Sequence, residues 1–140
     1  MTHLKSYTSL EQSKVLAEIL SLESAVNAIV SFGSREGTKT VVMPKETLDV
    51  IRTPFADIRE TTMCWSLAAL LSTLPNNENI STNLSKGGYR ISTLEYTNSW
   101  FVDYEDETDG LNNCVTSADN PVDACYEMIL KLHELKMLNL

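Results

Sequence analysis

The pattern of apolar positions is clearest near the C-terminus, where residues 120–138 predict a helix. Asn120 suits the N-cap, and Pro121 suits the first helical position, where no amide donor is needed. Lys136 near the predicted end matches the helix dipole. The apolar residues that follow at helical spacing are Val122, Cys125, Met128, Ile129, Leu132 and Leu135. A stripe of this length needs a partner surface, so we expect the helix to lie across a sheet.

Two earlier segments also carry apolar residues at helical spacing. In residues 7–20, Thr8 and Glu11 have the spacing of a capping box, and an apolar stripe follows them. Residues 61–75 predict a second helix, which Pro75 ends. The apolar face of this second helix is predicted to hold Cys64, Leu67, Ala68, Leu71 and Leu74.

The segments between these helices favour strands. Residues 25–32 and 38–43 are rich in β-forming residues and flank the turn-forming sequence "GSREG", so they predict a hairpin. Pro44 is expected to end the second strand, because proline has no amide hydrogen for the ladder. Residues 45–60 are predicted as a connection that contains one short helical turn.

Residues 89–106 alternate between apolar and polar side chains and predict a second hairpin, with its turn at 97–99. An additional edge strand is expected within residues 80–86 or 112–117. The order is then α, β-hairpin, α, β-hairpin, α. It predicts an α+β fold in one domain, residues 1–140, with helices packed on an antiparallel or mixed sheet.

The net charge of −8 is distributed unevenly. Residues 1–60 carry seven Lys and Arg against eight Asp and Glu, whereas residues 61–140 carry four against eleven. An acidic half repels phosphates, so the composition disfavours direct binding to nucleic acid and favours a basic protein partner.

Composition also argues against several other classes of protein. No window approaches the roughly 18 apolar residues of a membrane span, and the N-terminus "MTHLKSYTSLEQSK" lacks the apolar core of a signal peptide. We therefore expect a cytoplasmic protein without a membrane contact. Three cysteines and two histidines without metal-site spacing indicate neither a disulfide framework nor a zinc site, and no cofactor is expected.

The segment "DYEDETDG", residues 103–110, has five carboxylates in seven residues. A calcium loop would place Glu105, Glu107 and Asp109 at ligand positions, but Thr116 stands where the closing glutamate belongs. The preferred interpretation is a solvated acidic loop that prevents edge-to-edge association.

Catalytic motifs are not recognisable: GxSxG, HExxH, GxGxxG and the phosphate-binding loop are all missing. We therefore predict that the protein is not an enzyme. Aromatic residues of the second hairpin favour core packing or a protein interface over base stacking, because few basic residues accompany them. The predicted interaction surface consists of Tyr89, Arg90, Trp100, Asp103, Glu105, Asp106, Glu107 and Asp109.

Three segments carry a resemblance to known sequences: "YTSLEQSKVLAEILSLESA", "WSLAALLSTLP" and "NPVDACYEMILKLHELKML". Together they resemble a group of small uncharacterised proteins encoded by phages and prophages of gut bacteria. The resemblance covers about a third of the chain and transfers no catalytic residue. It implies an accessory protein of a mobile element that acts in the bacterial cytoplasm.

The leading hypothesis is a non-enzymatic accessory protein that acts through protein–protein interaction. One alternative is a small-ligand-binding protein or an enzyme that uses carboxylates and the aromatic hairpin. The other is an acidic nucleic-acid mimic that blocks a DNA-binding host protein. A homodimer is also predicted, because the first hairpin, with "TKTVVMP", leaves a sheet edge with a single lysine.

Overall fold

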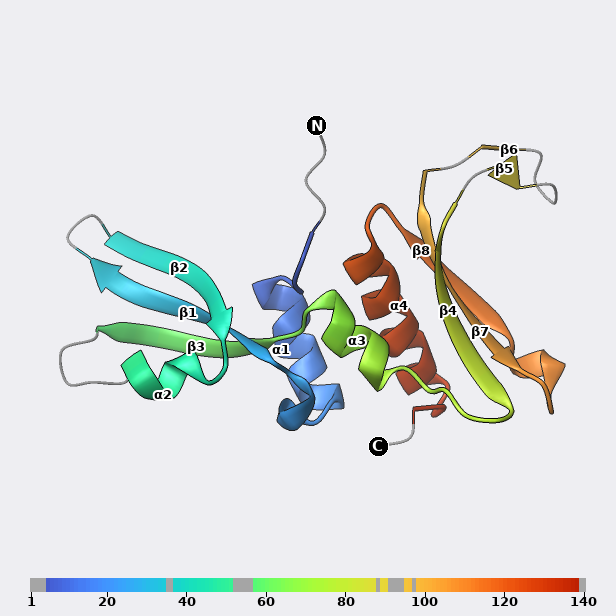
Figure 1. The fold of residues 1–140 in the computed structure, drawn as a ribbon, viewed down its shortest axis with the longest axis horizontal. Helices are drawn as coiled ribbons and strands as arrows, with labels where there is room; N and C mark the ends of the chain where they lie inside the picture. The colour runs from blue at the N-terminus through green and yellow to red at the C-terminus, as the bar shows by residue number, and fades with distance from the viewer. Residues whose placement is uncertain are drawn as a thin grey trace. The chain divides into compact units, whose positions relative to one another are not determined.

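The chain forms two compact units (Figure 1). Unit 1 consists of Met1–Ser6 and Leu70–Leu140, and unit 2 of Tyr7–Ala69. Each contains a three-stranded antiparallel sheet with helices, which confirms the predicted α+β class. That all 140 residues fold as one domain stays a prediction. The computed structural model describes residues 5–34, 37–51, 57–87, 89–90, 95–96 and 98–138.

The sheet of unit 2 has the strand order β2-β1-β3. The hairpin of β1 (Asn27–Ser34) and β2 (Gly37–Pro44) confirms the first predicted hairpin, and β2 ends at its proline as expected. The predicted helical turn is also present as α2 (Thr47–Ile51). Its Leu48 packs with residues of the sheet in a small apolar core. The other members of that core are Ala28, Val30, Phe32, Met43, Ile51, Ile58 and Met63.

The third strand, β3 (Ile58–Cys64), was not predicted, and the helix expected from residue 61 is wrong in its first half. Thr61 and Thr62 are β-branched and favour a strand, and this segment pairs with β1 along its length. The helix α3 is shorter and occupies Leu67–Thr73. Cys64 therefore ends a strand instead of lying on a helix face, although it is buried as expected.

The first helix, α1 (Leu10–Ile19), lies against β3 and is followed by the 3-10 turn η1 (Leu22–Ser24). Its capping box uses Ser9 and Gln12, so the prediction of Thr8 and Glu11 is wrong by one residue. Thr8 is buried, and its hydroxyl lies 2.8 Å from the hydroxyl of buried Ser13 and accepts a hydrogen bond from the distant Trp65 amide at 3.0 Å.

The sheet of unit 1 has the order β4-β7-β8, with β4 (Ile80–Lys86), β7 (Trp100–Asp106) and β8 (Cys114–Ala118). Strands lie in both segments where an additional edge strand was expected. They replace the predicted hairpin over residues 89–106, because β7 pairs with β4 and β8. The short strands β5 (Tyr89–Arg90) and β6 (Glu95–Tyr96) form a separate ladder.

The last helix, α4 (Pro121–Glu134), covers one face of this sheet, as predicted (Figure 1). Asn120 is the N-cap, and its side chain accepts a hydrogen bond from the amide of Asp123 at 2.9 Å. Two details near the end differ from the prediction. Leu135 is 49% exposed, and Lys136 lies beyond the helix with φ of 59°. The helix ends in a left-handed cap at Lys136. The buried apolar stripe therefore ends at Leu132, about one turn before the predicted Leu135. The buried stripe consists of Val122, Cys125, Met128, Ile129 and Leu132.

Candidate interaction surface

The alternation of side chains along β7 decides where the predicted acidic residues lie. Val102 and Tyr104 are buried on the face that α4 covers, so the intervening Asp103 and Glu105 lie on the open face of the sheet. Residues 103–106 are therefore part of a strand, and the prediction that they begin a solvated loop is wrong. The apolar side chains between the acids anchor this segment in the core.

The last acids of the segment stabilise the turn that follows β7. The Asp106 carboxylate accepts hydrogen bonds from the Thr108 hydroxyl at 2.7 Å and the Thr108 amide at 2.9 Å. Both contacts lower the pKa of Asp106, and the Thr108 hydroxyl has the larger effect. Asp109 caps the 3-10 turn η2 (Gly110–Asn112) by accepting from the amide of Leu111 at 3.1 Å.

These contacts give Asp106 and Asp109 a local structural role. Glu107 has an exposed side chain, and its amide donates to the carbonyl of Asn79 at 2.8 Å. Within the ranges that the structure describes, no group of three or more His, Cys, Asp or Glu side chains is placed to hold a metal ion.

The aromatic part of the predicted surface is separate from the acidic face. Trp100 begins β7 and is half-buried, with the Nζ atom of Lys86 6.0 Å from the centre of its ring. Its position in the strand places it on the same side as Val102, opposite to Asp103 and Glu105. The side chains of Tyr89 and Arg90 lie outside the described residues, although β5 includes their backbone.

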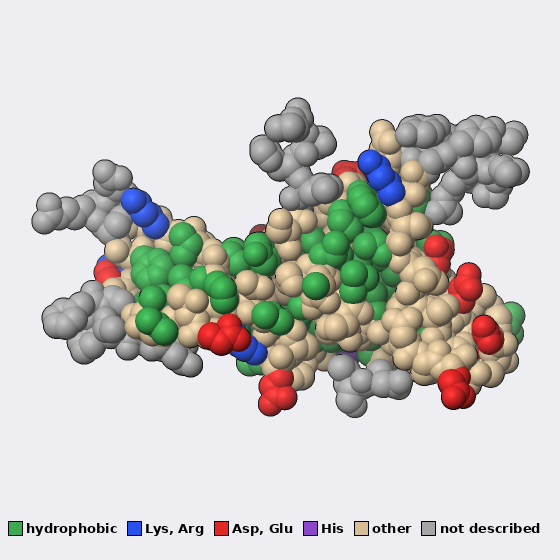
Figure 2. All heavy atoms as spheres, in the orientation of Figure 1, with side chains coloured by type: hydrophobic (Ala, Val, Ile, Leu, Met, Phe, Trp, Pro, Cys, Tyr) green, Lys and Arg blue, Asp and Glu red, His purple; other side chains and the backbone are tan. Residues whose placement is uncertain are grey.

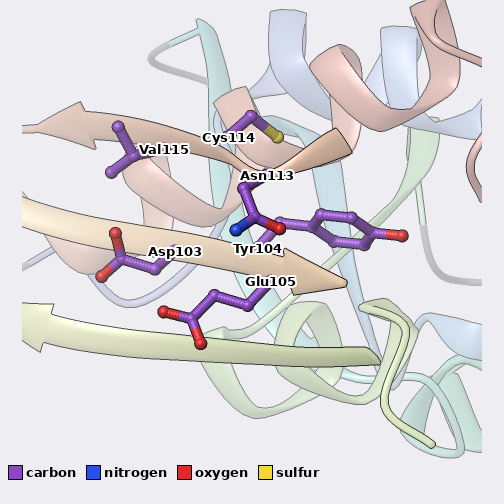
Figure 3. A pocket seen from close by; sticks show the side chains of 6 residues that line it. All are labelled: Asp103, Tyr104, Glu105, Asn113, Cys114 and Val115. Carbon is purple, nitrogen blue, oxygen red and sulfur yellow. The ribbon is translucent and has the colours of Figure 1, made fainter. Parts of the chain in front are cut away.

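A shallow open pocket of about 240 Å³ lies over β7 and β8 (Figure 3). Its acidic side is formed by Asp103 and Glu105, and Val115 projects from the neighbouring strand on the same face. The remaining lining residues are Tyr104, Asn113 and Cys114. The pocket therefore presents two carboxylates beside an apolar side chain.

Asn113 and Val115 were missed by the sequence analysis. The side-chain oxygen of Asn113 accepts a hydrogen bond from the amide of Asp106 at 2.8 Å and so continues the pairing of β7 with β8. The pKa of Tyr104 is raised, mainly by burial and to a smaller extent by the nearby Asp106 carboxylate. The β-branched Val115 and Thr116 favour a strand in this segment, which lies within residues 112–117, one of the two places where an additional edge strand was expected.

The acidic residues of the chain are concentrated in unit 1. Five Lys and Arg stand against eleven Asp and Glu there, whereas unit 2 has six against eight. Figure 2 shows acidic side chains over the part of unit 1 that contains β4, β7 and the turn after β7. One acid is neutralised locally, because Asp123 pairs with Lys5 at 2.8 Å. A positively charged partner is therefore attracted more strongly to unit 1 than to unit 2.

We predict that only Cys114 among the three cysteines reacts rapidly with a chromogenic disulfide reagent at pH 8. Cys64 and Cys125 are fully buried, and burial raises their pKa to about 11 and about 12. Burial also raises the pKa of Cys114, but this thiol is only partly buried and is the most accessible of the three, with its Sγ atom 3.8 Å from the Sδ atom of Met128. Stopped-flow absorbance should record one fast thiol, and urea should release the other two. Rapid reaction of a Cys114→Ser variant would contradict the prediction.

The same pKa values predict how stability depends on pH. The folded state keeps the Cys64 and Cys125 thiols protonated, whereas the unfolded chain ionises them near pH 9. Their contribution to stability is therefore complete below pH 9 and declines as pH rises towards 11 and 12.

No family model, curated protein or solved structure matches the chain. Within the described part of the chain, no helix combines the length and the apolar character needed to cross a membrane.

Proposed function

We propose that the protein is a non-enzymatic accessory protein of a phage or another mobile element. It acts in the bacterial cytoplasm by binding a basic protein through unit 1. The observation that carries this proposal is the open face of the β4-β7-β8 sheet. Asp103 and Glu105 lie on this face at alternate positions of β7. Neither carboxylate has an ion-pair partner among the described residues.

A pull-down from an enteric bacterial lysate tests this function. The wild-type chain should retain a protein that is lost when Asp103, Glu105 and Glu107 are neutralised to Asn, Gln and Gln. The matched control neutralises three exposed acids of unit 2, Glu18, Glu23 and Glu46, and should retain the same protein. Equal recovery by all three baits, or recovery by none, would count against the proposal.

A second candidate is the binding of a small ligand, or catalysis, in the pocket over β7 and β8. It rests on the two carboxylates of Asp103 and Glu105, which line one hollow together with Val115. A small basic ligand would be recognised by the two carboxylates. Equilibrium dialysis against a panel of polyamines and basic amino acids distinguishes the two, since a ligand protein would bind a small cation without any protein partner.

The acidic nucleic-acid mimic is a special case of the first proposal. It requires that the acids of unit 1 occupy the DNA-binding surface of the partner. DNA should then compete for the protein retained in the pull-down. Retention that is unaffected by an excess of duplex DNA would leave an ordinary protein interaction and remove the mimic.

We also predict a homodimer in which two copies pair through the edge strand β2. Val41 and Val42 of this strand are 43% and 41% exposed, and Lys39 is its only charged residue. An antiparallel pair about a two-fold axis satisfies the free edge of both copies at once. Sedimentation equilibrium at micromolar concentration should give twice the monomer mass of 15.6 kDa.

Substitution of Val42 by lysine should shift the homodimer towards monomer, because it places a charge in the paired region. Val115→Lys is the matched control, since Val115 is also half-exposed on an edge strand but lies in unit 1. A wild-type mass that remains at 15.6 kDa refutes the dimer. A dimer that Val42→Lys leaves intact would move the interface to Trp100 and its neighbours.

A further inference from the structure

Strand β8 is an edge of the β4-β7-β8 sheet, and its pairing with β7 fixes which of its backbone groups are used. In an antiparallel pair, residues alternate between those that exchange hydrogen bonds with the partner strand and those that do not. On an edge strand, the second kind directs its N–H and C=O groups away from the sheet.

Two hydrogen bonds at the end of β7 establish the direction of this alternation. The Asp106 amide donates to Asn113 on the β8 side at 2.8 Å, whereas the Glu107 amide donates to Asn79 on the β4 side at 2.8 Å. The backbone groups of Tyr104 and Val102 therefore also point to β8. Their partners there, Cys114 and Thr116, point back to β7. Val115 and Ser117 consequently direct their N–H and C=O groups outward.

The opposite edge of the sheet is covered by its own loop. On β4, the outward amide of Thr82 donates to the side chain of Asn76 at 3.0 Å, and that of Ile80 donates to Asn77 at 3.0 Å. The described residues provide no such hydrogen bond for the outward groups of Val115 and Ser117. The sequence "CVTSA" also lacks the lysine or proline that commonly protects an edge.

A hollow lies on each side of the β8 edge. The pocket with Asp103 and Glu105 lies on the open face, and a second hollow of about 350 Å³ lies between β8 and α4. Val115 lines both. The second hollow is lined by Val115, Thr116, Glu127, Leu130, Lys131 and Glu134. An added strand would place successive side chains alternately in the two hollows.

The charges of the two hollows differ, and they indicate which side chains a strand added to β8, called the guest strand, would carry. The open-face pocket has two carboxylates and no cation, whereas the α4 side has two glutamates with Lys131 and the apolar Leu130. A guest residue that pairs with Val115 places its side chain on the open face, where a Lys or Arg reaches across Val115 to Asp103. Antiparallel pairing also directs the backbone N–H of that same residue towards β8.

We propose that the β8 edge binds an extended basic segment of a partner protein by antiparallel strand addition. Lys or Arg side chains at alternate positions lie over Asp103 and Glu105, and small or apolar side chains lie against Leu130. This inference deepens the proposed function and rests on it, because it assigns the surface and the chemistry of the basic partner.

The test uses the full chain labelled with nitrogen-15 and a blocked peptide of sequence TKVKTKV. Titration followed by nuclear magnetic resonance should show binding, and saturating peptide should slow amide exchange of Val115 and Ser117 by roughly tenfold or more. Peptide methylated at the backbone nitrogens of its lysines keeps its charge but loses the donors, so it should bind about tenfold more weakly or worse. Methylation at the threonine and valine nitrogens, which point to solvent, should be tolerated.

Two variants of the protein complete the test. Val115→Pro removes an outward donor but leaves the ladder to β7 intact, and an edge strand tolerates proline at such a position. This variant should lose the peptide-dependent protection of the Ser117 amide from exchange. Asp103→Asn with Glu105→Gln should weaken binding roughly fivefold to tenfold, because both carboxylates lie at the guest side chains. Glu18→Gln with Glu23→Gln is the matched control in unit 2 and should bind like the wild-type chain.

The outcomes separate this inference from the proposed function. Binding that ignores backbone methylation, or that protects amides away from β8, overturns strand addition while leaving an acidic protein interface. Protection of Val115 and Ser117 that grows with protein concentration, without peptide, means that a second copy occupies the edge and also overturns the proposal. Absence of peptide binding overturns it as well. The proposed function fails with it only when the lysate pull-down also recovers no partner.

Discussion

Replacing Trp65 with alanine should lower the free energy of unfolding by about 3 to 5 kcal/mol, the largest effect expected from one substitution in unit 2. Trp65 is fully buried, and its indole nitrogen donates to the Ser24 hydroxyl at 2.9 Å. Its backbone amide donates to the Thr8 hydroxyl at 3.0 Å, and its carbonyl accepts from the Thr8 amide at 3.0 Å. The substitution leaves a cavity and removes the indole donor, whereas the Ser24 hydroxyl keeps its hydrogen bond to the carbonyl of Ser21 at 2.6 Å.

Urea unfolding followed by circular dichroism measures the effect. Trp65→Phe serves as the control, because it keeps most of the buried ring and removes only the indole donor. We expect it to cost about 1 to 2 kcal/mol, from a lost hydrogen bond and a smaller ring. A Trp65→Ala variant within 1 kcal/mol of the wild-type chain would show that this side chain is not part of a packed core.

Leu132→Ala in α4 should lower the free energy of unfolding by about 2 to 5 kcal/mol. Leu132 is fully buried on the stripe that covers the β4-β7-β8 sheet. Leu135→Ala is the matched control on the same chain segment. It should change the free energy of unfolding by less than about 0.5 kcal/mol, because Leu135 is 49% exposed.

The same variant tests the prediction of one domain. Fluorescence of Trp65 reports unit 2 when Trp100 is replaced by phenylalanine in the background. Helix α3 begins in unit 2 at Leu67 and ends in unit 1 at Thr73, so the boundary between the units lies within one continuous helix. A single domain predicts that Leu132→Ala lowers the Trp65 midpoint together with the circular dichroism midpoint. An unchanged Trp65 midpoint would mean two independently unfolding domains.

The elements that the sequence predicted well are those with local signals. Asn120 and Pro121 mark the start of α4 independently of any tertiary contact, and Pro44 marks the end of β2 in the same way. The segment of β3 has no such signal. Its "TTMC" is followed directly by the apolar "WSLAALL", so helical periodicity appeared to extend backwards into it. Pairing with β1, which is distant in sequence, decides its conformation.

The candidate surface was predicted in composition but not in geometry. The acids of residues 103–109 were identified from their density, and Asp103 and Glu105 do lie on one face. Their separation from Asp106 and Trp100 follows from the period of two along β7, which a loop interpretation ignores. Val115 and Asn113 carry no charge and stand eight or more residues away from Glu105, so only strand pairing brings them to the pocket.

The division of the chain has a consequence for its synthesis. Unit 1 is discontinuous, because its first residues precede unit 2 and its remainder follows it. The Lys5 ammonium meets the Asp123 carboxylate only after 118 further residues have been added. At a translation rate of roughly 5 to 20 residues per second, unit 2 is complete for several seconds while unit 1 still awaits α4. A chain that is still attached to the ribosome at this stage would expose the face of the unfinished sheet that α4 later covers. This interval is therefore the one in which a chaperone is most useful.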